Sequence, residues 1–121
     1  MATKKFETKR VHFASFFIAG FKYYEGPFVM DKFKLGDTLL LYPEPTNTHD
    51  ANAIIVAWKD KETKEEQKLG YVPASGDLCN EELIPFIEMD RMDIFELRIV
   101  GIYPDAQLNR RVEVNIYLTH K

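Results

Sequence analysis

The amino-acid sequence predicts a mostly β fold, a small six-stranded barrel of the OB-like or SH3-like kind with one or two short helices. Two observations favour this class. Strand signals dominate the chain while helix periodicity is scarce, and the best helix signal falls late, between the fourth and fifth expected strands. A parallel α/β fold would need helices that alternate with the strands, and the sequence lacks them.

Short runs of β-branched and aromatic residues mark the strands. The first strand is expected at residues 11–19, which are rich in valine, isoleucine and phenylalanine. Further strands are expected at residues 38–42, 52–59, 67–72, 94–104 and 111–120. In the last of these, apolar residues from Val112 to Leu118 alternate with polar ones, which is typical of a strand with one buried face.

One helix is expected at residues 80–91. Asn80 can cap this helix, and Glu81 and Glu82 would lie near its positive end. Pro85 is tolerated only in the first turn, so the helix should be short.

Composition indicates one globular domain. The 121 residues are 45% hydrophobic, and we expect a basic tail at residues 1–10 followed by one domain at residues 11–121. One cysteine, Cys79, cannot form an intrachain disulfide, which fits a reducing compartment and predicts a cytoplasmic location. No apolar run approaches the ~20 residues that span a bilayer, so no membrane association is expected. A net charge of −3 argues against binding duplex DNA by bulk electrostatics.

The sequence offers little chemistry for catalysis. Its three histidines form no i, i+4 pair and no cysteine cluster accompanies them, so no metal site is predicted. It contains no nucleophile elbow, Walker-type phosphate loop or dinucleotide fingerprint. We therefore predict a protein that is not an enzyme, with no catalytic residue and no cofactor. A hydrolase or nuclease built on His49 and Asp50 is the weaker alternative.

Two polar stretches are candidates for binding. Residues 44–54, EPTNTHDANAI, hold more polar groups than a turn requires, although Asn and Asp commonly bond to turn backbone, and local chemistry alone favours a turn. In residues 21–26, FKYYEG, a lysine can hold a phosphate and a tyrosine ring can stack on an unpaired base. If this stretch is extended, only one of Tyr23 and Tyr24 can face a given ligand.

Taken together, these stretches resemble the HIRAN domain family. The family pattern has an aromatic pair before a glycine, then Glu-Pro-x-Asn-x-x-Asp-x-Asn-Ala-Ile-x-Val, then Gly-Tyr-Val/Ile-Pro. The residues that match it are Tyr23, Tyr24, Gly26, Glu44, Pro45, Asn47, Asp50, Asn52, Ala53, Ile54, Val56, Gly70, Tyr71 and Pro73. The resemblance covers roughly residues 13–105 and implies an OB-like barrel.

The resemblance also implies a function, since members fused to DNA remodellers bind single-stranded DNA at a free 3′ end. Asp50 would accept a hydrogen bond from the terminal hydroxyl, Lys22 would hold a phosphate and Tyr23 would contact the backbone or a base. His49 would pack on the last nucleotide. The DNA-binding residues implied are Lys22, Tyr23, Tyr24, Asn47, His49, Asp50 and Tyr71. The implied role is in DNA repair or remodelling, beside a protein partner such as a helicase or nuclease.

The alternative function is a protein-interaction adaptor that has kept the fold and lost the DNA site. Ala74 stands where the family often has a basic residue, and His49 is a smaller stacking surface than the tyrosine of other members. The net charge of −3 favours the same alternative.

Overall fold

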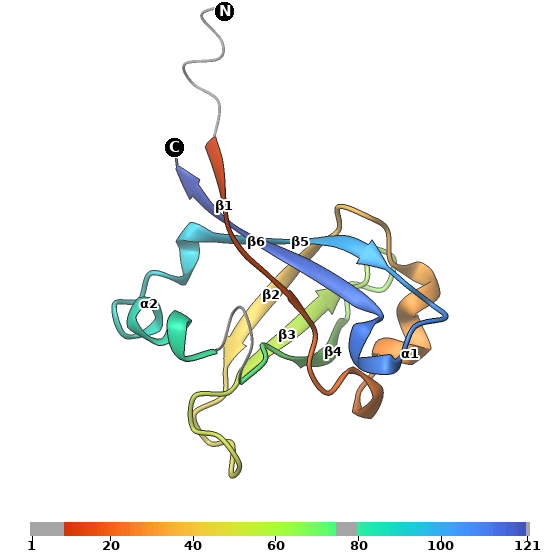
Figure 1. Cartoon of the computed structure of the whole chain (residues 1–121), viewed down its shortest axis with the longest axis horizontal. Helices are drawn as coiled ribbons and strands as arrows, with labels where there is room; N and C mark the ends of the chain where they lie inside the picture. The colour runs from red at the N-terminus through yellow and green to blue at the C-terminus, as the bar shows by residue number, and fades with distance from the viewer. Residues whose placement is uncertain (1–8, 75–79, 121) are drawn as a thin grey trace, which may run out of the picture.

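The computed structural model describes residues 9–74 and 80–120, whose six strands form one antiparallel sheet. Along the sheet the order is β1, β6, β5, β2, β3 and β4 (Figure 1). The strands are β1 (Lys9–Phe17), β2 (Thr38–Pro43), β3 (Ile54–Lys59), β4 (Glu66–Tyr71), β5 (Phe95–Ile102) and β6 (Val112–His120). The predicted mostly β fold is confirmed. Most of the predicted tail, residues 1–8, and Cys79 lie outside the described residues.

The sheet curls so that its two edge strands, β1 and β4, approach each other, but the continuous series of strand pairs does not close into a barrel. Beyond the end of β1, Ala19 forms an antiparallel bridge with Tyr71 of β4, and each N–H donates to the other carbonyl oxygen at 2.9 Å. Gly70 makes this approach possible because a Cβ there would clash with the carbonyl oxygen of Ala19. The bridge therefore places residues 21–26, which follow Ala19, beside the end of β4.

The core fills the inside of the curled sheet. Alternate residues of β6, Val112, Val114 and Ile116, are fully buried there, as the alternation predicts. Phe21 is only 1% exposed, and its ring occupies the space that a Cβ at Gly26 would take. Phe21 thus anchors the stretch at residues 21–26 to the core and fixes where its exposed neighbours lie.

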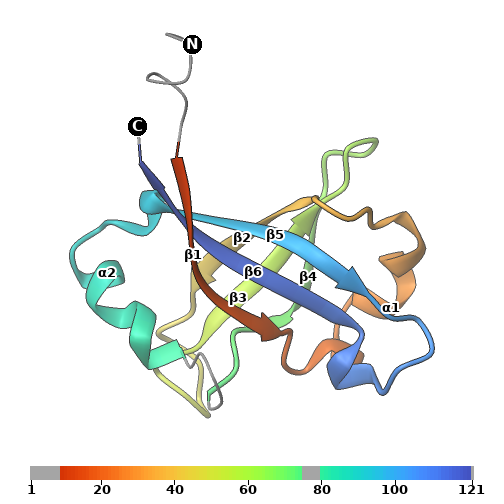
Figure 2. The same cartoon turned by 45° about the horizontal axis from the view of Figure 1, so that its top comes forward.

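Two short α-helices, α1 (Gly26–Val29) and α2 (Ile84–Glu88), lie at opposite ends of the sheet (Figure 2). The late helix is shorter than predicted, because a 3₁₀ turn occupies Asn80–Leu83 and Leu83, not Asn80, is the N-cap of α2. Pro85 falls in the first turn of α2, as expected. Within the described residues, no helix is both long and apolar enough to cross a membrane.

The two short helices agree with the predicted fold class, but the position of helix α1 was not predicted. Gly26 and Pro27 are residue types typical of turns between strands, but proline is also well suited to the first turn of a helix, where its missing N–H has no partner to lose. Residues 21–23 are likewise a 3₁₀ turn, η2 (Phe21–Tyr23), and not an extension of the first strand.

Candidate nucleic-acid interface

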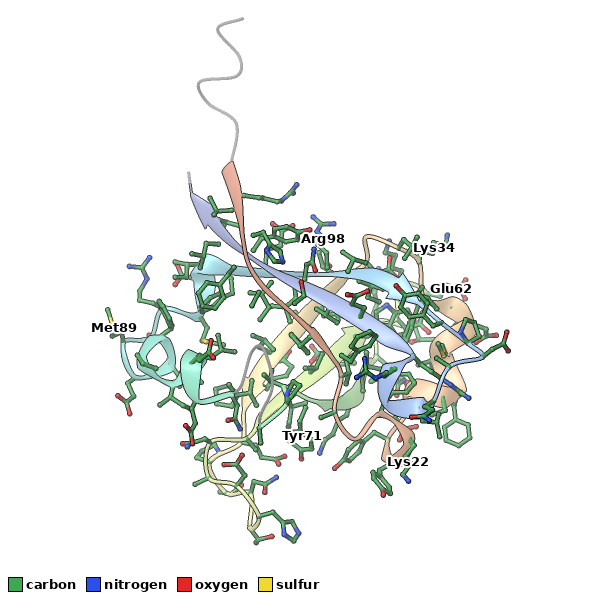
Figure 3. The ribbon with its side chains drawn as sticks, in the orientation of Figure 1. Lys22, Lys34, Glu62, Tyr71, Met89 and Arg98 are labelled. Atoms are coloured by element: carbon green, nitrogen blue, oxygen red, sulfur yellow. The ribbon has the colours of Figure 1, made fainter. Side chains whose placement is uncertain are left out.

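A polar network surrounds the hydroxyl of Tyr71 at the end of β4. The hydroxyl donates to Glu44 Oε1 at 2.7 Å and accepts from Lys68 Nζ at 2.7 Å. Asn47 Nδ2 donates to the same Glu44 oxygen at 2.8 Å and lies 3.4 Å from the Tyr71 hydroxyl. These bonds tie the loop after β2 to β4, on the lower edge of the molecule in Figure 3.

The charges within this network balance each other. The Tyr71 hydroxyl and then the Asn47 amide lower the pKa of the Glu44 carboxyl, because both donate to its anion. Burial alone would lower the pKa of Lys68, but its contacts with Tyr71, Tyr24 and Glu44 outweigh burial and raise it. Glu44 is therefore ionised and Lys68 protonated at neutral pH, and the two form an internal pair.

Lys68 lies between two tyrosine rings. Its Nζ is 4.2 Å from the ring centroid of Tyr24 and 4.6 Å from that of Tyr71, and it is 3.8 Å from the Glu44 carboxylate. The two rings meet edge to face with centroids 5.7 Å apart. Because rings and a carboxylate already surround this ammonium group, Lys68 holds the site together and does not supply a free cation.

Asp50 is held by two neutral donors. Its Oδ1 accepts from the backbone N–H of Asn52 at 2.9 Å, and its Oδ2 accepts from Asn80 Nδ2 at 2.7 Å. Asn80 is only 2% exposed, so this second donor is fixed. Among the side chains that the structure describes, no ion pair involves Asp50. Each carboxylate oxygen has a second lone pair, so Asp50 can accept a further hydrogen bond.

Asn47 shapes the loop that carries Asp50. Its Oδ1 accepts from the backbone N–H of His49 at 2.8 Å and of Asp50 at 2.9 Å. The carbonyl side of the amide thus braces the turn while its NH₂ side bonds to Glu44. His49 itself is exposed.

Lys22 and Tyr23 form the exposed part of the candidate site. Tyr23 is 72% exposed, and Lys22 Nζ lies 4.9 Å from its ring centroid. The two residues line a shallow groove with Gln107, Leu108 and Arg111. The ring of Tyr24 packs against Tyr71 instead of lying with Tyr23. Tyr23 and Tyr24 therefore point in different directions, as predicted, but because of a 3₁₀ turn and not because of strand alternation.

The predicted site residues fall into one connected set and one neighbouring pair. Ring contacts and hydrogen bonds link Tyr24, Tyr71, Asn47 and Asp50 in that order. Lys22 and Tyr23 adjoin this set along the chain, and Lys22 and Tyr71 lie on the same edge in Figure 3. Within the described residues, no hydrogen bond or ion pair joins Lys22 to Asp50.

Comparisons with known proteins agree with the architecture. A sequence model of the HIRAN domain matches residues 11–121. The crystal structure of a protein from Lactobacillus plantarum is similar with a TM-score of 0.65, at 18% identity over 95% of this chain and 100% of that chain, which shows a shared fold. No curated protein matches the chain. Since the match spans nearly all of its residues, the chain belongs to the HIRAN domain family, a family of domains that bind nucleic acid.

Proposed function

We propose that this HIRAN domain binds single-stranded DNA at a free 3′-hydroxyl end, in DNA repair or remodelling. The observation that supports the proposal is the Asp50 carboxylate, which two neutral donors hold and no described cation neutralises. A carboxylate repels the phosphates of a strand interior but accepts a hydrogen bond from a hydroxyl. A 3′ end that carries a phosphate would be rejected at the same position.

Lys22 and Tyr23 would hold the strand behind its end. Both side chains are exposed, and Lys22 contacts the ring of Tyr23, whereas Lys68 is engaged by contacts inside the site. An ammonium group contacts a phosphate as a point charge, and an exposed ring offers a face to an unpaired base. His49, Asn47, Tyr24 and Tyr71 complete the proposed DNA-binding set, with Asn47 and Tyr71 acting on the shape of the loop.

Matched oligonucleotides that end in a 3′-hydroxyl or a 3′-phosphate test the proposal by fluorescence anisotropy. We expect the hydroxyl form to bind about tenfold more tightly, since a hydrogen bond to a charged group contributes about 1.5–3 kcal/mol. Asp50→Asn should reduce this ratio more than it reduces total binding. Equal affinity for both ends in the unaltered protein would rule out recognition of the 3′ end.

A protein-interaction adaptor is the competing function. The observation that favours it is Ala74, which is exposed just after β4 and adds no cation to the site. Recovery of a protein partner, together with no binding of any oligonucleotide at low salt, would decide for the adaptor.

A further inference from the structure

The outer face of β1, β6 and β5 carries polar and aromatic side chains. β6 lies between the other two strands, so residues at matched register positions form rows across all three. The rows are His12–Tyr117–Glu96, Ser15–Asn115–Arg98 and Phe17–Glu113–Gly101. Figure 2 shows these strands at the front of the molecule, with α1 and α2 at the ends and no helix across them.

Hydrogen bonds hold the middle of this outer face in place. Ser15 Oγ donates to Asn115 Oδ1 at 2.7 Å, and Asn115 Nδ2 donates to the Tyr117 hydroxyl at 3.0 Å. His12 Nε2 lies 2.8 Å from Ser15 Oγ, whose proton is already used, so the histidine ring donates. A surface that is already ordered loses little conformational entropy when it binds a partner.

Aromatic rings occupy both ends of the outer face. His12 and Tyr117 meet edge to face with centroids 6.0 Å apart, and Phe17 and Tyr103 are tilted with centroids 6.4 Å apart. Tyr103 is 44% exposed and lies over Gly101, where a Cβ would clash with its ring. His12 is exposed as well, so each end of the outer face offers ring surface on which an unpaired base can stack.

Positive charge is in excess on this face, although the whole chain has a net charge of −3. Among the side chains that the structure describes, the arginines of this face are Arg10, Arg98 and Arg110, and its acids are Glu96 and Glu113. Glu96 accepts from Arg10 Nε at 3.1 Å and Arg98 Nε at 2.6 Å, while Glu113 accepts from the Tyr103 hydroxyl at 3.0 Å. Both acids are therefore engaged within the face.

The arginines stand beside the rings. Arg10 and Arg98 line one groove together with Tyr117 and Val100, and Arg98 is labelled on this part of Figure 3. At the other end, the guanidinium of Arg110 lies 5.3 Å from the ring centroid of Phe17. Each Nε of Arg10 and Arg98 bonds to Glu96, and Arg98 Nη1 also donates to the carbonyl oxygen of Gly36 at 2.8 Å. Among the described contacts, this leaves Arg98 Nη2 and the terminal nitrogens of Arg10 to reach a phosphate.

We propose that the outer face of β1, β6 and β5 is a second binding surface, one that takes the interior of a single-stranded nucleic acid. Bases stack on the rings at its two ends, and the phosphates between them contact Arg10, Arg98 and Arg110. The surface shares no residue with the site around Asp50 and recognises no strand end. It therefore holds whether or not the domain recognises 3′ ends.

A circular single-stranded DNA, and a circular RNA of the same length, test this surface because neither has a 3′ end. We expect the domain to bind at least one circle at low salt. The double variant Arg10→Ala/Arg98→Ala should lower the slope of log affinity against log salt by about 1.4, since each phosphate contact to a single strand contributes about 0.7. Tyr117→Ala should weaken binding about tenfold through the lost stacking surface.

Three control variants complete the experiment. Tyr42→Ala removes a tyrosine that is 41% exposed on β2, and Lys34→Ala removes an exposed cation. Because neither residue lies on the outer face, neither substitution should affect circle binding. Asp50→Asn should leave circle binding intact while it alters end preference. Thermal unfolding checks each fold. The double variant at the exposed Arg10 and the half-buried Arg98 keeps the test valid if Tyr117→Ala unfolds.

Two results would overturn the second surface: failure to bind either circle at low salt, or circle binding that the double arginine variant leaves unchanged. If the unaltered protein shows no preference for a 3′-hydroxyl end but binds a circle, only the function proposed for Asp50 is contradicted.

Discussion

At the residue scale, Asn80 decides how Asp50 presents its carboxylate. The amide reaches Asp50 from a segment 30 positions away in the sequence, and Asn80 is buried, which fixes the donor. Asn80→Ala should destabilise the fold by about 1.5–3 kcal/mol, because a hydrogen bond from a buried amide to a charged group is lost. It should also weaken the preference for a 3′-hydroxyl, which anisotropy and urea unfolding measure on the same sample.

Asn52 provides the matched control for this prediction. It bonds to Asp50 through its backbone N–H, which alanine retains. Asn52→Ala should therefore preserve end preference. If Asn80→Ala were to leave end preference unchanged as well, the orientation of Asp50 would not matter for recognition.

Glu44 makes stability depend on pH. Donors in the folded state hold its pKa below the ordinary 4.5, so its contribution to stability is present above that value and is lost as pH falls through the folded-state pKa. The pKa values of Asp60 and Glu96 are also lowered, and both groups add to the same acid sensitivity. The contribution of Glu44 is therefore measured as the difference in acid sensitivity between the unaltered protein and a Glu44 variant. Urea unfolding at several pH values should show a smaller loss of stability on acidification for Glu44→Gln than for the unaltered protein.

At the scale of elements, Gly70 allows the edges of the sheet to meet. Its φ of 151° is rarely adopted by other residues, and a Cβ would clash with the carbonyl oxygen of Ala19. Gly70→Ala should cost about 2–4 kcal/mol of unfolding free energy from backbone strain and overpacking combined. DNA affinity should fall too, because the bridge positions residues 21–26.

Gly36 separates the two contributions. Its φ of 89° is also positive, but nothing lies within 4 Å of the position that a Cβ would take. Gly36→Ala therefore reports backbone strain alone. An equal cost for both substitutions would show that the clash with Ala19 is relieved by movement and that the bridge tolerates a side chain.

The strands were predictable because their signal is local. Alternation from Val112 to Leu118 and the β-branched run before Trp58 mark β6 and β3 within a few residues of the observed bounds. The turn η2 and helix α1 were not predicted, since a glycine and a proline fit both a loop and a helix start.

The candidate site was only half predictable for a related reason. Motif spacing identified Asn47, Asp50 and Tyr71, which the structure does connect. It could not identify Lys68 or Asn80, because the contacts of Lys68 with Tyr24 and Glu44 and of Asn80 with Asp50 join distant segments that no periodicity encodes. Both missed residues determine how the predicted ones are held.

At the scale of the whole molecule, charge distribution matters more than net charge. Lys68 is paired with Glu44 inside the site, so Lys22 is the lysine of the proposed end site that can contact a phosphate. Lys22→Ala should reduce affinity for a 3′-hydroxyl oligonucleotide and lower the salt slope by about 0.7, measured by anisotropy across a salt series. Lys34→Ala, an exposed lysine outside the site, should change neither quantity; an unchanged slope for Lys22→Ala would remove Lys22 from the interface.

The amides of the bridge between Ala19 and Tyr71 can also be used to measure how often this part of the fold opens. Each of its two amide protons donates to the carbonyl oxygen of the other residue, and Tyr71 itself belongs to the proposed end site. A fluctuation that separates the segment after β1 from β4 must release them, so their hydrogen–deuterium exchange rates measure how often residues 21–26 leave β4. A ligand that binds only the assembled site must slow both amides by the same factor, whatever its chemistry.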